Sequence, residues 1–161
     1  MSLALYTDPE LMIPQLRSKD AAAVIAELCS TLHRTGRVEN LLPFYNEVIS
    51  RELLSSTATP SGLAIPHARS PQIEQLCFVV GRSPEPVVWL GQKGPGVHLV
   101  FLFAVPENEI AAYLSLLAGF SKLTQDKLRL ESLLAAPDRQ AMFDVLRHTP
   151  ARKSRAPALK T

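Results

Sequence analysis

Hydrophobic residues recur at helical spacing in the first third of the chain. From Ser18, which we assign as the capping residue, apolar positions follow every three or four residues until Gly36. A second run of this kind begins near Leu41 and continues to about Leu53. The first 17 residues are broken by two prolines and predict a short extended segment. The pattern therefore predicts two amphipathic helices behind an extended start, with Arg51 and Glu52 at the polar end of the second helix.

The middle of the chain has the pattern of a sheet. A loop rich in Ser and Thr precedes Gly62, and apolar, partly β-branched runs follow it. These predicted strands are Leu63–Ile65, Leu76–Val80, Val97–Val105 and, more weakly, Val87–Leu90. The run 97–105 is apolar except for His98, as expected of a strand that is covered on both faces.

Helical spacing returns after Glu107. One side of this third predicted helix carries Ile110, Leu114, Leu117, Ala118 and Ser121. Two short helical stretches then end near Leu146. The order of helices, strands and helices predicts one α/β domain, with a single sheet and helices packed against it in an α/β sandwich.

Composition and charge divide the chain into a body and a tail. The 161 residues are 47% hydrophobic and 20% charged, which is typical of one soluble globular domain. The formal net charge is +2, but residues 149–161 contain four basic residues and no acid. We therefore expect a mildly acidic domain over residues 1–148 and a basic, disordered tail over 149–161.

Several classes of protein do not fit the sequence. Apolar runs fall short of the roughly 18 residues that a membrane helix needs, and the first residues do not resemble a secretory leader. We expect a cytoplasmic protein with no direct membrane insertion and no nucleic-acid partner. Cys29 and Cys77 have no metal-binding spacing and are expected to be reduced and packed as small apolar groups. Glycine-rich nucleotide loops are absent from the sequence, so no cofactor is expected.

His67 is the main candidate for chemistry among four histidines. It lies near the end of the segment GLAIPHAR, in which Pro66 fixes the backbone before it and Arg69 adds a permanent positive charge. We expect it to leave the strand 63–65 in a defined direction. The other histidines have structural interpretations. His33 lies at the end of the first predicted helix, where the helix dipole favours a positive charge. His98 opens a predicted strand, and His148 is expected to be solvated.

Three chemistries are open to His67 on residue types alone. It could bind a metal, but no HxH, HExxH or carboxylate cluster surrounds it in the sequence. It could act as a general base for a loop hydroxyl in a hydrolase, but no GxSxG pattern occurs. It could itself accept a phosphoryl group, and only this chemistry uses the nearby arginines and hydroxyls together.

Three segments resemble one known family in order and spacing. SKDAAAVIAEL, ISRELLSSTATPSGLAIPHAR and GVHLVFLFAVPENE are similar to the fructose/mannitol/nitrogen-regulatory type of enzyme IIA domain of the bacterial phosphoenolpyruvate-dependent phosphotransferase system (PTS). The resemblance covers about residues 3–147. It implies an α/β sandwich whose mixed sheet is flanked by helices on both faces, and it implies a phosphotransferase component rather than a free-standing enzyme.

The resemblance also implies the site and its partners. His67 would accept a phosphoryl group from an HPr-type phosphocarrier protein. Arg51 would neutralise the phosphoryl charge, and the Thr57 hydroxyl would line the site. The recipient would be a IIB domain or, in the nitrogen branch, a regulatory partner that senses the phosphorylation state.

Tyr113 departs from the family pattern. The family carries a second histidine at this place, whereas this chain has YLSLLAGF. A phenol can donate one hydrogen bond to a phosphoryl oxygen or to His67, but with a pKa of about 10 it cannot become a cation near neutral pH. The alternative hypothesis is therefore a binding module of the same fold that is impaired in onward transfer.

Overall fold

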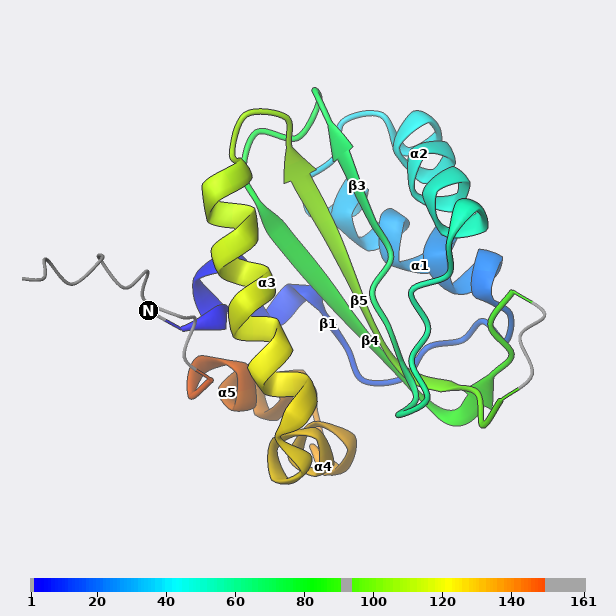
Figure 1. Cartoon of the computed structure of the whole chain (residues 1–161), viewed down its shortest axis with the longest axis vertical. Helices are drawn as coiled ribbons and strands as arrows, with labels where there is room; N and C mark the ends of the chain where they lie inside the picture. Colours follow the sequence, from blue (N-terminus) through cyan, green and yellow to red (C-terminus); the bar gives the residue numbers. More distant parts are fainter. Residues whose placement is uncertain (1, 91–93, 150–161) are drawn as a thin grey trace, which may run out of the picture.

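One five-stranded sheet with helices on both of its faces makes up the domain (Figure 1). The computed structural model describes residues 2–90 and 94–149. Its strands are β1 (Met12–Ile13), β2 (Leu63–Ala64), β3 (His67–Ser70), β4 (Cys77–Val87) and β5 (Val97–Pro106). Its helices are α1 (Ala21–Arg34), α2 (Leu41–Leu54), α3 (Ile110–Gln125), α4 (Lys127–Ala135) and α5 (Arg139–Arg147), with two short 3-10 helices at Leu3–Tyr6 and Pro9–Leu11. The predicted α/β sandwich is confirmed.

The sheet is mixed and is built around β5. The strand order is β1-β4-β5-β2, and β3 pairs with β5 beyond the end of β2. β4 runs antiparallel to β5, whereas β2 and β3 run parallel to it and β1 runs parallel to β4. The weak fourth strand predicted at Val87–Leu90 is wrong. β4 continues to Val87 instead, and beyond it only an isolated bridge forms, between Val88 and Asp20.

β3 is the strand that the sequence pattern missed. We expected His67 to leave the strand 63–65 and predicted no strand directly after it, but His67–Ser70 pairs with β5, with His67 opposite Phe103. The interruption has a local cause, because Pro66 has no N–H and the N–H of Ile65 donates to the Thr57 hydroxyl instead of to a strand. The carbonyl oxygen of Pro66 still accepts from Phe103 N at 3.0 Å, so the chain stays at the sheet edge.

Alternation along β5 separates the two faces of the sheet. Phe101 and Phe103 both pack edge-on against Phe120 of α3, with ring centroids 4.5 and 5.4 Å away. On the opposite face a Cβ placed on Gly81 would meet Leu28 of α1 at 2.9 Å. Glycine at this position therefore lets α1 lie close to β4.

The buried side of α3 differs from the prediction. Its buried residues are Leu116, Gly119, Phe120 and Leu123. Ile110 and Leu114 were expected on the inner side but are 47% and 59% exposed. Apolar residues on both sides of this helix made the periodicity ambiguous.

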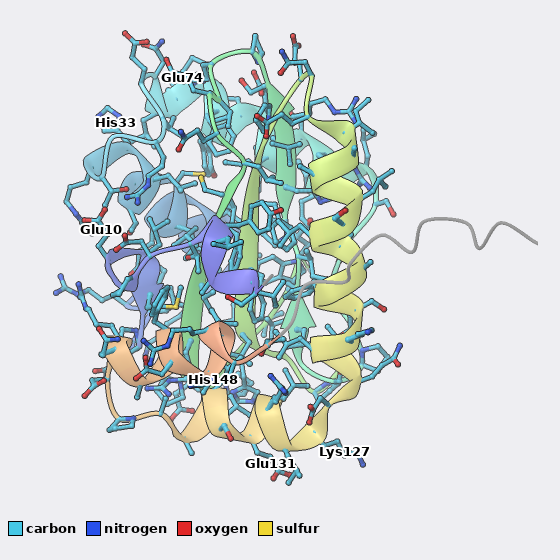
Figure 2. The ribbon with its side chains drawn as sticks, turned by 90° about the vertical axis from the view of Figure 1, so that its left-hand side faces the viewer. Glu10, His33, Glu74, Lys127, Glu131 and His148 are labelled. Atoms are coloured by element: carbon cyan, nitrogen blue, oxygen red, sulfur yellow. The ribbon has the colours of Figure 1, made fainter. Side chains whose placement is uncertain are left out.

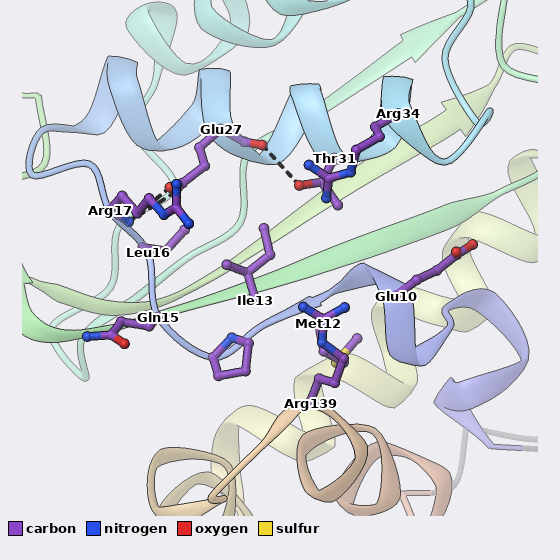
Figure 3. A pocket seen from close by; sticks show the side chains of 11 residues that line it. Glu10, Met12, Ile13, Gln15, Leu16, Arg17, Glu27, Thr31, Arg34 and Arg139 are labelled. Atoms are coloured by element: carbon purple, nitrogen blue, oxygen red, sulfur yellow. Dashed lines mark hydrogen bonds between the residues drawn. The ribbon is translucent and has the colours of Figure 1, made fainter.

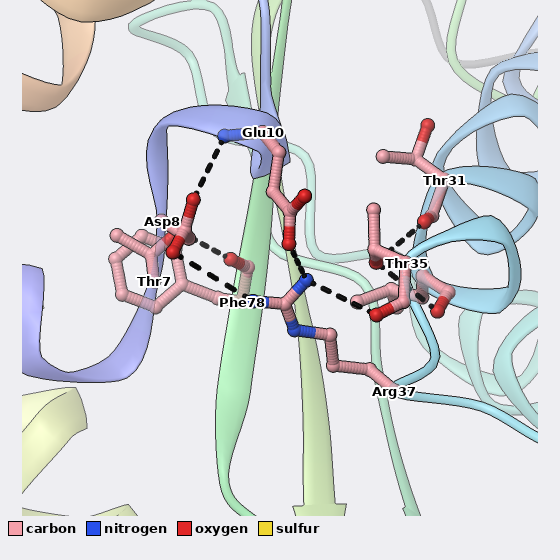
Figure 4. Close-up of polar contacts among 8 residues, drawn as sticks. Thr7, Asp8, Glu10, Thr31, Thr35, Arg37 and Phe78 are labelled. Carbon is pink, nitrogen blue, oxygen red and sulfur yellow. Dashed lines mark hydrogen bonds and ion pairs between the residues drawn. The ribbon is translucent and has the colours of Figure 1, made fainter.

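The first 17 residues also differ from the short extended segment that we expected. They form the two 3-10 helices and β1, and Asp20 rather than Ser18 caps α1 by accepting from Ala23 N at 2.9 Å. Arg37, which follows α1, reaches back to the carboxylates of Asp8 and Glu10 (Figure 4). These contacts fasten the N-terminal segment to the domain.

The start of the predicted tail is part of the packed domain. Thr149 is buried, and its carbonyl oxygen accepts from Leu3 N at 3.0 Å. The rest of that prediction, residues 150–161, lies outside the described residues. Among the helices that are described, none is both long and apolar enough to cross a membrane.

Candidate functional site

The position of His67 follows from the period of β3. Successive side chains of a strand point to opposite faces, so His67 and Arg69 share a face while Ala68 points the other way. Because His67 is opposite Phe103 in the register, this is the face that α3 covers. His67 is half-buried there, and its ring centroid lies 6.2 Å from that of Tyr113 at the start of α3.

The ring nitrogens of His67 are not equivalent. Nδ1 lies 3.0 Å from the carbonyl oxygen of Ile65. A carbonyl oxygen only accepts, so this contact places the hydrogen of the neutral ring on Nδ1. Nε2 is then the nitrogen with the free lone pair, and it is the nucleophilic atom of the ring.

A cavity of about 310 Å³ gathers four of the five predicted site residues. β3 contributes His67 and Arg69, α3 contributes Tyr113, and the last turn of α2 contributes Arg51. Glu47, one helical turn before Arg51, also lines it and was not predicted. Two cations, an imidazole and a phenol from three separate elements therefore face one space.

The lining of this cavity carries two positive charges, Arg51 and Arg69, against one negative charge, Glu47, and this balance favours an anionic ligand. Neither Arg51 nor Arg69 takes part in the ion pairs found among the described residues. Burial raises the pKa of the Tyr113 phenol above its ordinary value, and the positive charges of Arg51 and Arg69 only partly oppose this. The phenol therefore stays protonated at neutral pH and can donate a hydrogen bond.

Thr57 does not line the cavity. Its hydroxyl lies 3.0 Å from both carboxylate oxygens of Glu52 and 2.8 Å from Ile65 N. Glu52 was predicted at a polar helix end, but it is 1% exposed. The spacing Phe44, Val48, Glu52 continues the buried stripe of α2 and is the sequence signal that identifies it.

The other three histidines lie outside this cavity. His33 and His148 are exposed and lie well apart on the surface (Figure 2). The Nδ1 atom of His33 contacts Val38 O, and that of His98 contacts Ser83 O. Each of these two rings is thus tied to a nearby backbone carbonyl.

A larger groove of about 940 Å³ lies at the β1 edge of the sheet (Figure 3). Arg17, Arg34 and Arg139 line it, but it contains no histidine or cysteine. β4 and β5 separate this edge from β3 in the strand order. We place the candidate site in the smaller cavity because, of these two, only the smaller one has a histidine in its lining, and that histidine lies beside two arginines.

Neither cavity offers a metal site. Within residues 2–90 and 94–149, no three His, Cys, Asp or Glu side chains gather closely enough to hold a metal ion. The polar groups that line the candidate site are His67, Arg51, Arg69, Glu47 and the Tyr113 phenol.

Comparison with known families gives a match over nearly the whole chain. The sequence profile described as "Phosphoenolpyruvate-dependent sugar phosphotransferase system, EIIA 2" matches residues 5–149. A nitrogen regulatory protein of Bradyrhizobium diazoefficiens is 32% identical over 144 residues, which are 89% of this chain and 93% of that protein.

Two further comparisons concern a longer protein and a solved structure. The 2-O-alpha-mannosyl-D-glycerate-specific EIIABC component of Escherichia coli is 32% identical over 80% of this chain, and the match spans only 20% of that protein. The crystal structure of the nitrogen regulatory protein IIA-Ntr from Neisseria meningitidis superposes with a TM-score of 0.81 at 24% identity, over 89% of this chain and 98% of that one.

Proposed function

This chain belongs to the EIIA 2 family of the phosphoenolpyruvate-dependent sugar phosphotransferase system, and on that premise we propose that it is a phosphocarrier that accepts a phosphoryl group on His67. One observation carries the proposal. His67 has a free Nε2 and shares a cavity with two arginines that have no ion-pair partner among the described residues. A nucleophile beside uncommitted cations suits phosphoryl transfer, in which positioning and charge stabilisation supply most of the catalysis.

The transfer step follows from the ring geometry. The lone pair of Nε2 forms the new nitrogen–phosphorus bond, while the donor's phosphorus–nitrogen bond breaks and its electron pair returns to the donor imidazole. The hydrogen on Nδ1 stays in place and faces the Ile65 carbonyl oxygen, which stabilises the positive charge that the ring acquires. Arg51 and Arg69 stabilise the phosphoryl oxygens, and Tyr113 donates a hydrogen bond to one of them.

The partners of this reaction are phosphohistidine or phosphoacceptor proteins. The donor that we propose is an HPr-type phosphocarrier. The recipient is a IIB domain, and a relative that combines EIIA, EIIB and EIIC in one chain supports this choice. The similarity to nitrogen regulatory proteins supports a regulatory partner as the second kind of recipient.

A phosphorylation assay tests the acceptor. The chain is incubated with phosphoenolpyruvate, enzyme I and several HPr-type donors, and labelling is followed by mass and by acid lability. The wild type is expected to gain one acid-labile phosphoryl group, and His67→Ala to gain none. His33→Ala and His148→Ala are matched controls because both residues are exposed and lie outside the cavity. Failure of every donor to label the wild type contradicts the phosphocarrier role.

Tyr113 supports a second candidate function. The ring centroids of Tyr113 and His67 lie 6.2 Å apart. The phenol of Tyr113 stays neutral near pH 7, so it cannot supply the switchable positive charge of a histidine. The candidate is a regulatory module that is phosphorylated and sensed by a partner but transfers the group onward slowly.

The substitution Tyr113→His separates the two candidates. A large gain in transfer to a IIB acceptor, with first phosphorylation unchanged, supports the transfer-impaired regulator. An unchanged or lower transfer rate shows that tyrosine works in the relay and favours the full phosphocarrier.

A further inference from the structure

A buried carboxylate lies behind the candidate site. Glu52 ends the buried stripe of α2, is 1% exposed, and forms no ion pair in the part of the chain that the structure describes. It accepts hydrogen bonds from Trp89 Nε1 at 2.8 Å, from Thr57 N at 2.7 Å and from the Thr57 hydroxyl at 3.0 Å. A buried carboxyl group costs free energy unless its oxygens are hydrogen-bonded, and here Thr57 and Trp89 supply the donors.

The direction of the hydrogen bonds at Thr57 is determined by chemistry. A carboxylate only accepts, so the single hydroxyl hydrogen of Thr57 is donated to Glu52. The hydroxyl oxygen is then left as an acceptor, and Ile65 N donates to it at 2.8 Å. Glu52 thereby orients Thr57, and Thr57 holds the peptide N–H of Ile65.

The same residue, Ile65, contacts His67. Its carbonyl oxygen lies 3.0 Å from Nδ1 of His67. The N–H of Ile65 therefore donates to Thr57 and its carbonyl oxygen accepts from the imidazole, so both groups bond to side chains and not to a neighbouring strand. The contacts form one continuous series from Trp89 through Glu52, Thr57 and Ile65 to His67.

We propose that Glu52 and Thr57 are positioning residues that hold the Ile65 peptide so that His67 keeps its hydrogen on Nδ1 and presents Nε2 as the nucleophile. Trp89 fixes the Glu52 carboxylate from the other side, through a donor that is itself only 2% exposed. The consequence for transfer rests on the phosphocarrier function proposed above. The consequence for the tautomer of His67 does not.

The tautomer can be read directly from the ring nitrogens. Long-range ¹H–¹⁵N correlation spectra of the ¹⁵N-histidine-labelled chain distinguish protonated from unprotonated ring nitrogens, and His67→Ala assigns the signals. The wild type is expected to show His67 protonated on Nδ1. Thr57→Val keeps the side-chain shape and removes the hydroxyl, so it should shift His67 toward the Nε2–H form and slow phosphorylation by roughly ten- to a hundredfold.

Two variants separate positioning from a general effect on the loop. Thr57→Ser keeps the hydroxyl and should restore both the tautomer and the rate. Thr59→Val is the matched control, because the Thr59 hydroxyl accepts from Leu63 N in the same loop but contacts neither Glu52 nor Ile65. It should leave the tautomer and the rate as in the wild type.

Other outcomes have defined meanings. If the wild type carries its hydrogen on Nε2, or if folded Thr57→Val matches the wild type in tautomer and rate, the proposal is wrong. If Thr57→Val does not fold, Trp89→Phe, which removes one donor to Glu52, takes its place with the same criteria. If no donor phosphorylates the wild type while Thr57→Val still shifts the tautomer, the phosphocarrier function fails and the positioning role stands.

Discussion

At the scale of single residues, His67 and Arg51 show how the candidate site is assembled from ordinary side chains. The contact of Nδ1 with one backbone carbonyl oxygen leaves Nε2 of His67 with the free lone pair, and Arg51 lines the same cavity from another element. The side chain of Arg51 is exposed and its Nη1 donates to Ser55 O at 3.2 Å. The guanidinium is thus partly oriented before any ligand arrives.

Arg51 gives the first prediction. Arg51→Ala should lower the rate of His67 phosphorylation by about a hundredfold, the usual cost of removing one group that stabilises developing charge. The phosphorylation rate of Arg51→Lys should lie between those of Arg51→Ala and the wild type, because a lysine keeps the positive charge but lacks the planar guanidinium with its several donors. Rates are measured under single-turnover conditions with the phosphorylated donor. Arg34→Ala is the control, since Arg34 is also an exposed arginine near a helix end but lines the other groove. Equal rates for Arg51→Ala and Arg34→Ala would contradict the assigned role.

At the scale of helices and strands, some elements could be predicted from the sequence and one could not. α1 and α2 could be predicted because their apolar residues keep a clear helical period, and β5 because it is a long apolar run. β3 could not, because its four residues, HARS, have neither length nor an apolar face. It is a strand only because β5 offers it an edge.

The candidate site shows the same division. His67, Arg51, Arg69 and Tyr113 could be selected from motif and charge, and they do line one cavity. Glu52 escaped the prediction because a carboxylate next to an arginine near a helix end usually faces solvent. Its three donors come from Thr57 and from Trp89, which is 37 positions away in the sequence, and no local pattern brings them together.

The loop before β2 gives a second prediction, which belongs to the scale of elements. Gly62 has a φ of 84°, a conformation that a side chain makes unfavourable, and its carbonyl oxygen accepts from both His98 N and Leu99 N. Gly62→Ala should lower the free energy of unfolding by about 1–2 kcal/mol. Urea denaturation measures this. Gly94→Ala is the control, because a Cβ there meets no atom of the described residues within 4 Å and its φ is not positive. If Gly62→Ala lowers the free energy of unfolding no more than Gly94→Ala does, the loop relaxes around the new side chain and the prediction is wrong.

Two buried thiols outside the site give the whole molecule a pH dependence of stability. Cys29 and Cys77 are free and buried, as the sequence led us to expect. Burial raises the pKa of Cys29 to about 12 and that of Cys77 to about 11, with Arg37 lowering the latter slightly. The folded protein therefore retains thiol protons that the unfolded chain, with a thiol pKa of 9.0, releases.

Stability should fall on the alkaline side as a result. The contribution of the two thiols is fully present below pH 9 and is lost as the pH rises toward 11 and 12, because only the unfolded chain loses protons in that window. Urea denaturation under reducing conditions at several pH values measures the slope. Cys29→Ala should make it shallower, and Ser30→Ala, the neighbouring helix position, should leave it unchanged. A flat dependence in the wild type between pH 9 and 11 would contradict this prediction.

The central claim concerns one atom, Nε2 of His67, and it can be tested at that atom. The phosphorylated protein, labelled with ¹⁵N-histidine, is examined by ¹H–¹⁵N and ³¹P spectroscopy to find which ring nitrogen carries phosphorus. We predict a single phosphohistidine at position 67, linked through Nε2, with the hydrogen remaining on Nδ1 beside the Ile65 carbonyl oxygen. Phosphorus on Nδ1, or on any histidine other than His67, would contradict the account.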